Sequence, residues 1–142
     1  MTMTKIILHL LETLTYRFRS SISQVDDSFA NLDIGHGVRS PIEILYHMRG
    51  VMYYANKAIT EKRTEMSSIS RWDKEVALFI ESVEGLKANI SKVEISEEIA
   101  FRMVQGPISD ALTHVGQLAM LSRVHGHPID KENFFKADIG NN

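Results

Sequence analysis

The 142-residue sequence has no cysteine, three prolines, one tryptophan and a formal net charge of only −2. The absence of cysteine excludes disulfides, cysteine-ligated zinc or iron–sulfur sites and a cysteine nucleophile. The chain also lacks the basic excess of a nucleic-acid-binding protein. No apolar run approaches the ~20 residues that span a membrane, and no targeting segment is evident. We therefore expect a cytoplasmic protein with no nucleic-acid or membrane partner.

Length and composition predict a single domain over residues 1–142. Hydrophobic residues make up 44% and charged residues 24%, close to the average for a soluble globular protein. A chain of this size buries roughly two-thirds of its unfolded surface, so it needs no disulfide or metal merely to fold.

Apolar residues recur at helical spacing in four stretches, and the few prolines and glycines fall mostly between them. Ser40, Pro41 and Glu43 form a strong helix start with a capping box, and Ser70 offers another cap. The second helix leaves its register open between His47 with Tyr54 and Met48 with Ala55. The segment 93–104 fits either a short helix or an extended connector. The predicted helices cover about residues 4–22, 41–63, 71–90 and 106–125.

These four amphipathic helices predict an all-α fold, an antiparallel four-helix bundle with short connecting segments. Two of the helical seams carry a histidine, His47 in the second and His114 in the fourth. A buried ring without a hydrogen-bond partner costs about 1–3 kcal/mol, so each needs one. Asp110 lies four residues before His114, on the same helix face. We expect His47, Asp110 and His114 to point into the bundle and to converge.

Two imidazoles and a carboxylate suit a divalent transition metal. Zinc with three protein ligands keeps a fourth position open, and the same set, arranged facially, holds non-haem iron. A simpler interpretation also stands: Asp110 is an acid at a helix start, bonded to a satisfied core histidine.

Gln117 shares the face of Asp110 and His114, and can orient a ligand or touch substrate. We take it as the candidate catalytic residue, against the alternative that it fills the edge of the core. Among the other histidines, His9 should be solvated and His36 lies in a glycine-flanked loop. His125 and His127 flank a helix end, where a structural role is favoured over surface metal binding.

Two blocks of sequence, residues 37–48 and residues 110–121, resemble the second and last helices of the DinB-like family of bacterial metal-binding four-helix bundles. Residues 71–76 and 126–129 add to the resemblance, which covers nearly the whole chain. The family shows one histidine on the second helix, matched by His47, and an H-x-x-x-H pair on the last. Here Asp110 replaces the first histidine of that pair, and His114 matches the second.

The resemblance implies a divalent metal (zinc, nickel, manganese or iron) and a homodimer. It further implies an enzyme, a transferase or hydrolase, whose metal activates a low-molecular-weight thiol or water for attack on a small electrophilic substrate. The alternatives are a non-catalytic metal-binding or stress-response bundle with structural histidines and, from ligand count alone, an oxygen-using iron protein.

Overall fold

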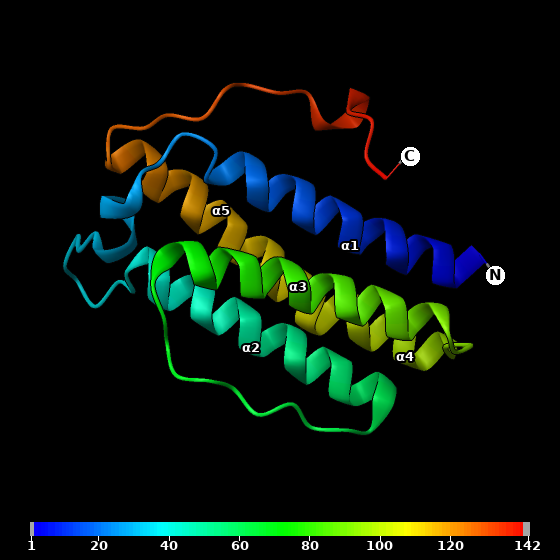
Figure 1. The fold of residues 1–142 in the computed structure, drawn as a ribbon. Helices are drawn as coiled ribbons and strands as arrows, with labels where there is room; N and C mark the ends of the chain where they lie inside the picture. Colours follow the sequence, from blue (N-terminus) through cyan, green and yellow to red (C-terminus); the bar gives the residue numbers. More distant parts are fainter. Residues whose placement is uncertain (1, 141–142) are drawn as a thin grey trace.

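The computed structural model describes residues 2–140, which form four helical rods (Figure 1). The first three are α1 (Thr2–Ser21), α2 (Pro41–Thr60) and α3 (Trp72–Ser91). The fourth is continuous from α4 (Glu97–Met103) through the π-helical turn η2 (Val104–Ile108) to α5 (Ser109–Val124). Two short 3-10 helices, η1 (Asp27–Asn31) and η3 (Phe134–Lys136), lie outside the rods. No strand occurs between residues 2 and 140, so the all-α prediction is confirmed.

The rods do not all run antiparallel to their neighbours in the chain. Figure 1 shows α2 and α3 running in the same direction, with α1 and the α4–α5 rod running the opposite way. The reason is the connection of 11 residues from α2 to α3, residues 61–71, here called the crossing segment. At about 3.3 Å per residue it reaches about 36 Å, enough to return along a 20-residue helix of about 30 Å. The expectation of short connections is wrong at this point.

Most of the predicted seams form the core. In α1, Ile7, Leu11, Leu14 and Phe18 are fully buried, as are the α3 residues Phe79, Val83, Leu86 and Ile90. In α2 the open choice of register is decided: Met48 and Ala55 are buried, whereas Tyr54 is 72% exposed. The capping box at Ser40 and Glu43 is present, and α2 ends at Thr60, three residues earlier than expected.

The last rod begins at Ser96, which caps α4, and not near Gly106 as the sequence suggested. Proline in a helix interior normally removes a hydrogen bond and clashes with the preceding turn. Here Pro107 lies inside the wider turn η2, and Ser109 Oγ donates to the carbonyl oxygen of Val104. The chain therefore continues as helix through a residue that we expected to start one. Such π turns are frequent at functional sites, and this one ends two residues before Asp110.

A buried ion pair that the sequence did not suggest joins α2 to α3. Arg49 and Glu75 are both fully buried, with Nε to Oε1 at 3.0 Å and Nη2 to Oε2 at 3.1 Å. The backbone N–H of Ser70 donates to the same carboxylate at 2.8 Å, so Ser70 serves this pair and does not cap α3. Tyr46 Oη donates to the carbonyl oxygen of Ser67 at 2.9 Å. These contacts fix the crossing segment against α2.

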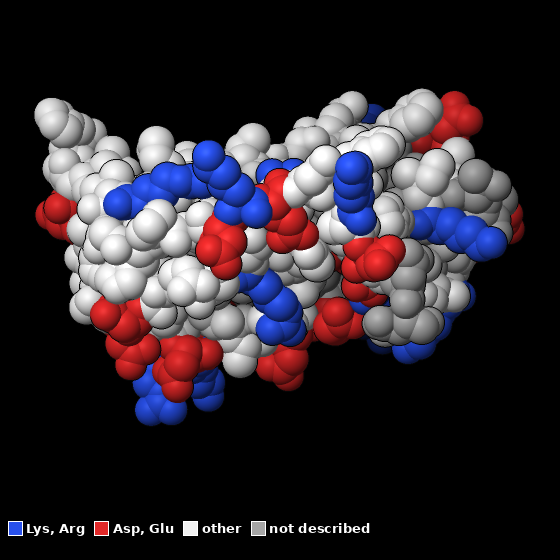
Figure 2. All heavy atoms as spheres, turned by 90° about the horizontal axis from the view of Figure 1, so that it is seen from above, with Lys and Arg blue, Asp and Glu red and all other residues white. Residues whose placement is uncertain are grey.

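On the molecular face seen in Figure 2, acidic and basic side chains are interspersed, and neither sign forms a continuous patch. This distribution accords with the small net charge of the chain. Among the described residues, no helix has both the length and the apolar character required to cross a membrane.

Candidate metal centre

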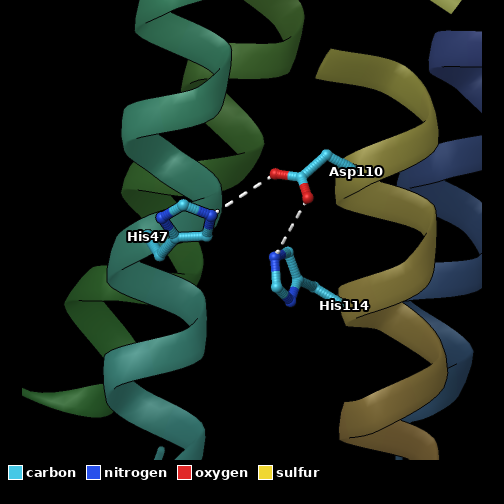
Figure 3. Close-up of side chains that lie close together, drawn as sticks. All are labelled: His47, Asp110 and His114. Carbon is cyan, nitrogen blue, oxygen red and sulfur yellow. Dashed lines mark hydrogen bonds and ion pairs between the residues drawn. The ribbon is translucent and has the colours of Figure 1, made fainter. Parts of the chain in front are cut away.

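His47 of α2 meets Asp110 and His114 of α5 in the space between the two rods (Figure 3). His47 Nε2 lies 3.3 Å from Asp110 Oδ2, and His114 Nε2 lies 3.4 Å from Asp110 Oδ1. The imidazole rings are nearly perpendicular, with centroids 4.9 Å apart. One ligand atom from each residue lies within 4.8 Å of the other two. The predicted convergence of these residues, here called the cluster, is therefore present in the structure.

Local sequence places each member of the cluster. The i, i+4 spacing of Asp110 and His114 stacks them one turn apart at the start of α5. Pro41 and the capping box fix the start of α2, so His47 falls in its second turn. Because Met48 takes the buried register, His47 lies beside the core and faces α5.

The cluster lies at the edge of the bundle, and not in its interior as the seam assignment predicted. The side chain of His114 is 12% exposed, whereas those of His47 and Asp110 are 39% and 45% exposed. Val115, the next residue of α5, takes the buried position that we had assigned to His114. Ala111, Leu118 and Leu121 are buried as well, so His114 borders the buried line of α5. One side of the cluster is therefore open to solvent and to small molecules.

Gln117 fixes the proton on His114. Its Oε1 lies 2.8 Å from His114 Nδ1, and because an amide oxygen only accepts, Nδ1 carries the hydrogen. In the neutral imidazole, Nε2 then presents a lone pair to the carboxylate of Asp110, 3.4 Å away. Two acceptors facing each other need a cation between them, either a proton or a metal ion. Gln117 is itself exposed and acts on His114, so its contact is that of a positioning residue.

The donor set fits a divalent transition metal. Zinc bound to imidazole nitrogen and carboxylate oxygen has bond lengths of about 2.0–2.2 Å, which place neighbouring tetrahedral ligands about 3.3–3.5 Å apart. The two nitrogen-to-oxygen distances in the cluster, 3.3 and 3.4 Å, fall in that range and run to different oxygens of Asp110, and the three ligand atoms lie within 4.8 Å of one another. The hydrogen bond from His114 to Gln117 is the kind of support that metal-bound histidines ordinarily have.

An open groove of about 1230 Å³ runs beside the cluster between α2 and the last rod. His47 and Asp110 line it, together with residues of η2 and of the crossing segment. The contribution of the crossing segment to the groove was not predictable from the sequence, because residues 61–71 show no helical periodicity. Its apolar lining residues are Gly50, Val51, Tyr54, Met66, Ile69 and Pro107.

The remaining histidines form no comparable group; the cluster is the one such three-residue set found in residues 2–140. His9 is exposed, as predicted, and His36 occupies a left-handed loop position at φ 59°. His125 and His127 face each other, Nδ1 to Nδ1, at 2.9 Å. His125 also contacts Ser28 and His127 lies 3.8 Å from Asp26, so this pair ties the α5 end to the loop after α1.

No protein-family model, curated protein or solved structure matches this chain.

Proposed function

We propose that the chain is a metal-dependent enzyme of the DinB-like class. His47, Asp110 and His114 would hold a divalent transition metal beside the groove that His47 and Asp110 line. The observation that carries this proposal is that His47 Nε2 and His114 Nε2 each face one oxygen of the Asp110 carboxylate, with Gln117 Oε1 bonded to Nδ1 of His114. The proximity of the three ligand atoms, all within 4.8 Å of one another, supports it, as does the resemblance of residues 37–48 and 110–121 to the family.

A metal bound at this place supplies a Lewis acid that lowers the pKa of a coordinated thiol or water. The protein's own residues do the rest. Gln117 keeps the Nε2 lone pair of His114 directed toward the cluster, and Asp110 contributes negative charge between the two rings. The groove provides room for an electrophilic substrate next to His47. A homodimer and a low-molecular-weight thiol as co-substrate belong to this proposal through the family resemblance.

Cobalt substitution tests thiol activation directly. The Co(II)-loaded protein should develop a thiolate-to-cobalt charge-transfer band when a small thiol such as cysteine is added. The Asp110→Ala variant should show no such band, because the ion has lost a ligand. Absence of the band with several small thiols, in protein that retains cobalt, would refute thiol activation and leave water as the nucleophile.

The second candidate is a non-catalytic bundle whose histidines are structural. It is favoured by one observation, that a proton between His114 Nε2 and Asp110 would satisfy the same two atoms as a metal. In that case the melting temperature of the purified protein should not respond to chelator. The enzyme proposal predicts a lower melting temperature after metal removal, because binding to the folded state alone stabilises it.

A further inference from the structure

The size, shape and lining of the groove beside the cluster indicate which class of ligand it can bind. It is somewhat larger than the 300–1,000 Å³ of typical small-molecule sites, and its surface is mostly apolar. It extends from Arg39, which precedes α2, along that helix past His47 to Tyr54. A ligand that fills it is therefore elongated, with the cluster beside part of its length.

The polar side chains that line the groove are mostly bonded within the protein. Tyr46 Oη donates to the carbonyl oxygen of Ser67, and Thr113 Oγ1 donates to that of Asp110 at 2.6 Å. Glu43 Oε1 accepts from the backbone N–H and the hydroxyl of Ser40, at 3.1 and 2.7 Å. Because each of these hydroxyl hydrogens already has an acceptor, the three side chains offer no free donor, and ligand acceptors buried unpaired against them would be costly. These walls therefore select against a ligand that is polar along its length.

Outside the cluster, the groove is lined by one positive and one negative side chain, Arg39 and Glu43. Arg39 is the one Lys or Arg in the lining, and Glu43 lies one helical turn along. The pKa of Glu43 is lowered, mainly by its hydrogen bonds with Ser40 and in smaller part by the positive charge of Arg39. Because the two charges interact with each other, this end of the groove offers no net charge to attract an ionic ligand.

The wall that the crossing segment forms is adaptable. A Cβ atom at Gly50 would lie 3.0 Å from Met66 Sδ, so the glycine lets the thioether lie close to α2. Met66 and Ile69 come from the crossing segment, and Val51 comes from α2. Methionine side chains repack readily around apolar groups, which suits a ligand held by shape and not by hydrogen bonds.

From these features we infer that the groove binds an elongated, uncharged apolar molecule whose single polar or reactive group lies at the cluster. The inference names the substrate class of the proposed enzyme, and rests on that proposal only for the reactive end. The apolar end depends on the groove alone, so it can be tested without metal.

The metal-independent test uses the neutral fluorescent probe N-phenyl-1-naphthylamine with metal-free protein. We expect saturable binding with enhanced fluorescence, weakened at least about tenfold by Val51→Asp or Ile69→Asp, since each places a charge in the apolar wall. Phe135→Asp is the matched control, because Phe135 is 97% exposed and does not line the groove. Both wall residues are partly exposed, so the variants should fold, as circular dichroism would verify. No saturable binding, or equal binding by all three variants, would overturn the inference.

A second test joins the apolar end to the cluster with hydroxamates, which chelate metal through one end. In zinc-loaded protein, octanohydroxamate should bind at least about 30-fold more tightly than acetohydroxamate, since each fully buried methylene contributes about fourfold. A terminal carboxylate on the longer chain should remove most of that gain. Equal affinity for the short and long hydroxamates would overturn the inference. If the protein binds the probe but holds no metal even after loading, the groove's ligand class is supported and the enzyme proposal is refuted.

Discussion

Replacing Arg49 by methionine tests the structural basis of the groove wall. The guanidinium and the Glu75 carboxylate are both fully buried and joined by two hydrogen bonds, of 3.0 and 3.1 Å. Arg49→Met would leave a buried carboxylate with only the Ser70 N–H as partner among its present contacts. Removing one member of a buried ion pair costs about 3–5 kcal/mol. That is a large part of the roughly 7–20 kcal/mol expected for a chain of this length.

Urea unfolding at neutral pH measures this cost. The midpoint for Arg49→Met should fall by about 2 M, given slopes of about 1–3 kcal/mol/M for proteins of this kind. Arg102→Met is the matched control, since Arg102 pairs with Glu98 on the surface, with side chains 66% and 74% exposed. Its unfolding free energy should change by less than about 1 kcal/mol.

The double variant Arg49→Met/Glu75→Leu decides whether the uncompensated charge causes the loss. Because both charges are then removed, it should be more stable than Arg49→Met alone. A cost below about 1 kcal/mol for Arg49→Met, or additive losses in the double variant, would refute the reasoning. Probe binding in the groove should also weaken in Arg49→Met, because Arg49 Nη1 lies 3.3 Å from Ser67 Oγ of the crossing segment.

Three further predictions each concern a single residue. Hydrogen bonds from Ser40 lower the pKa of Glu43 in the folded protein below its ordinary 4.5. The ionised Glu43 therefore stabilises the folded state above pH 4.5, and this stabilisation is lost as the pH falls through the lower, folded-state pKa. The difference in urea midpoint between wild type and Glu43→Ala should therefore shrink in acid, and a constant difference from pH 7 to 3 would contradict this. Gly116→Ala should raise the unfolding free energy by about 1 kcal/mol, because Gly116 is helical with open space around it; a loss of stability in the melt would disprove that. Gln117→Ala should weaken metal binding about 10- to 100-fold in a competition titration, whereas Gln105→Ala, which alters no contact of His114, should leave the affinity unchanged.

The helices were predictable from sequence because each buries a continuous apolar line, but their directions were not. The α1 seam matches the buried residues closely, since no polar residue interrupts it, whereas the buried line of α3 also includes Glu75. The parallel course of α2 and α3 depends on the crossing segment, whose aperiodic sequence does not reveal that it spans a helix length. The start of the last rod was predicted too late in the chain, because Pro107 suggested a helix start. A π turn accommodates a proline that the interior of an α-helix would not.

The three residues of the candidate site were predictable from the sequence, but the extent to which they are buried was not. The i, i+4 spacing within α5 and the position of His47 on α2 were sufficient to bring three side chains together. Val115 takes the buried position in this turn of α5, so His114 lies beside the core and Asp110 is half exposed. Arg49 and Glu75 were missed because charged residues on a helix normally face water. Their signal was present in the sequence, since Arg49 lies on the apolar line with Leu45 and Met52.

The central claim, that His47, Asp110 and His114 hold a metal ion, is tested most directly by elemental analysis of untagged protein purified without chelator. The account predicts close to one equivalent of a divalent transition metal, lost in His47→Ala and in Asp110→Ala. It also predicts that His9→Ala, which removes an exposed histidine far from the cluster in sequence, retains the metal. Wild-type protein that holds no metal even after reloading, or metal that survives both cluster substitutions, would contradict the account.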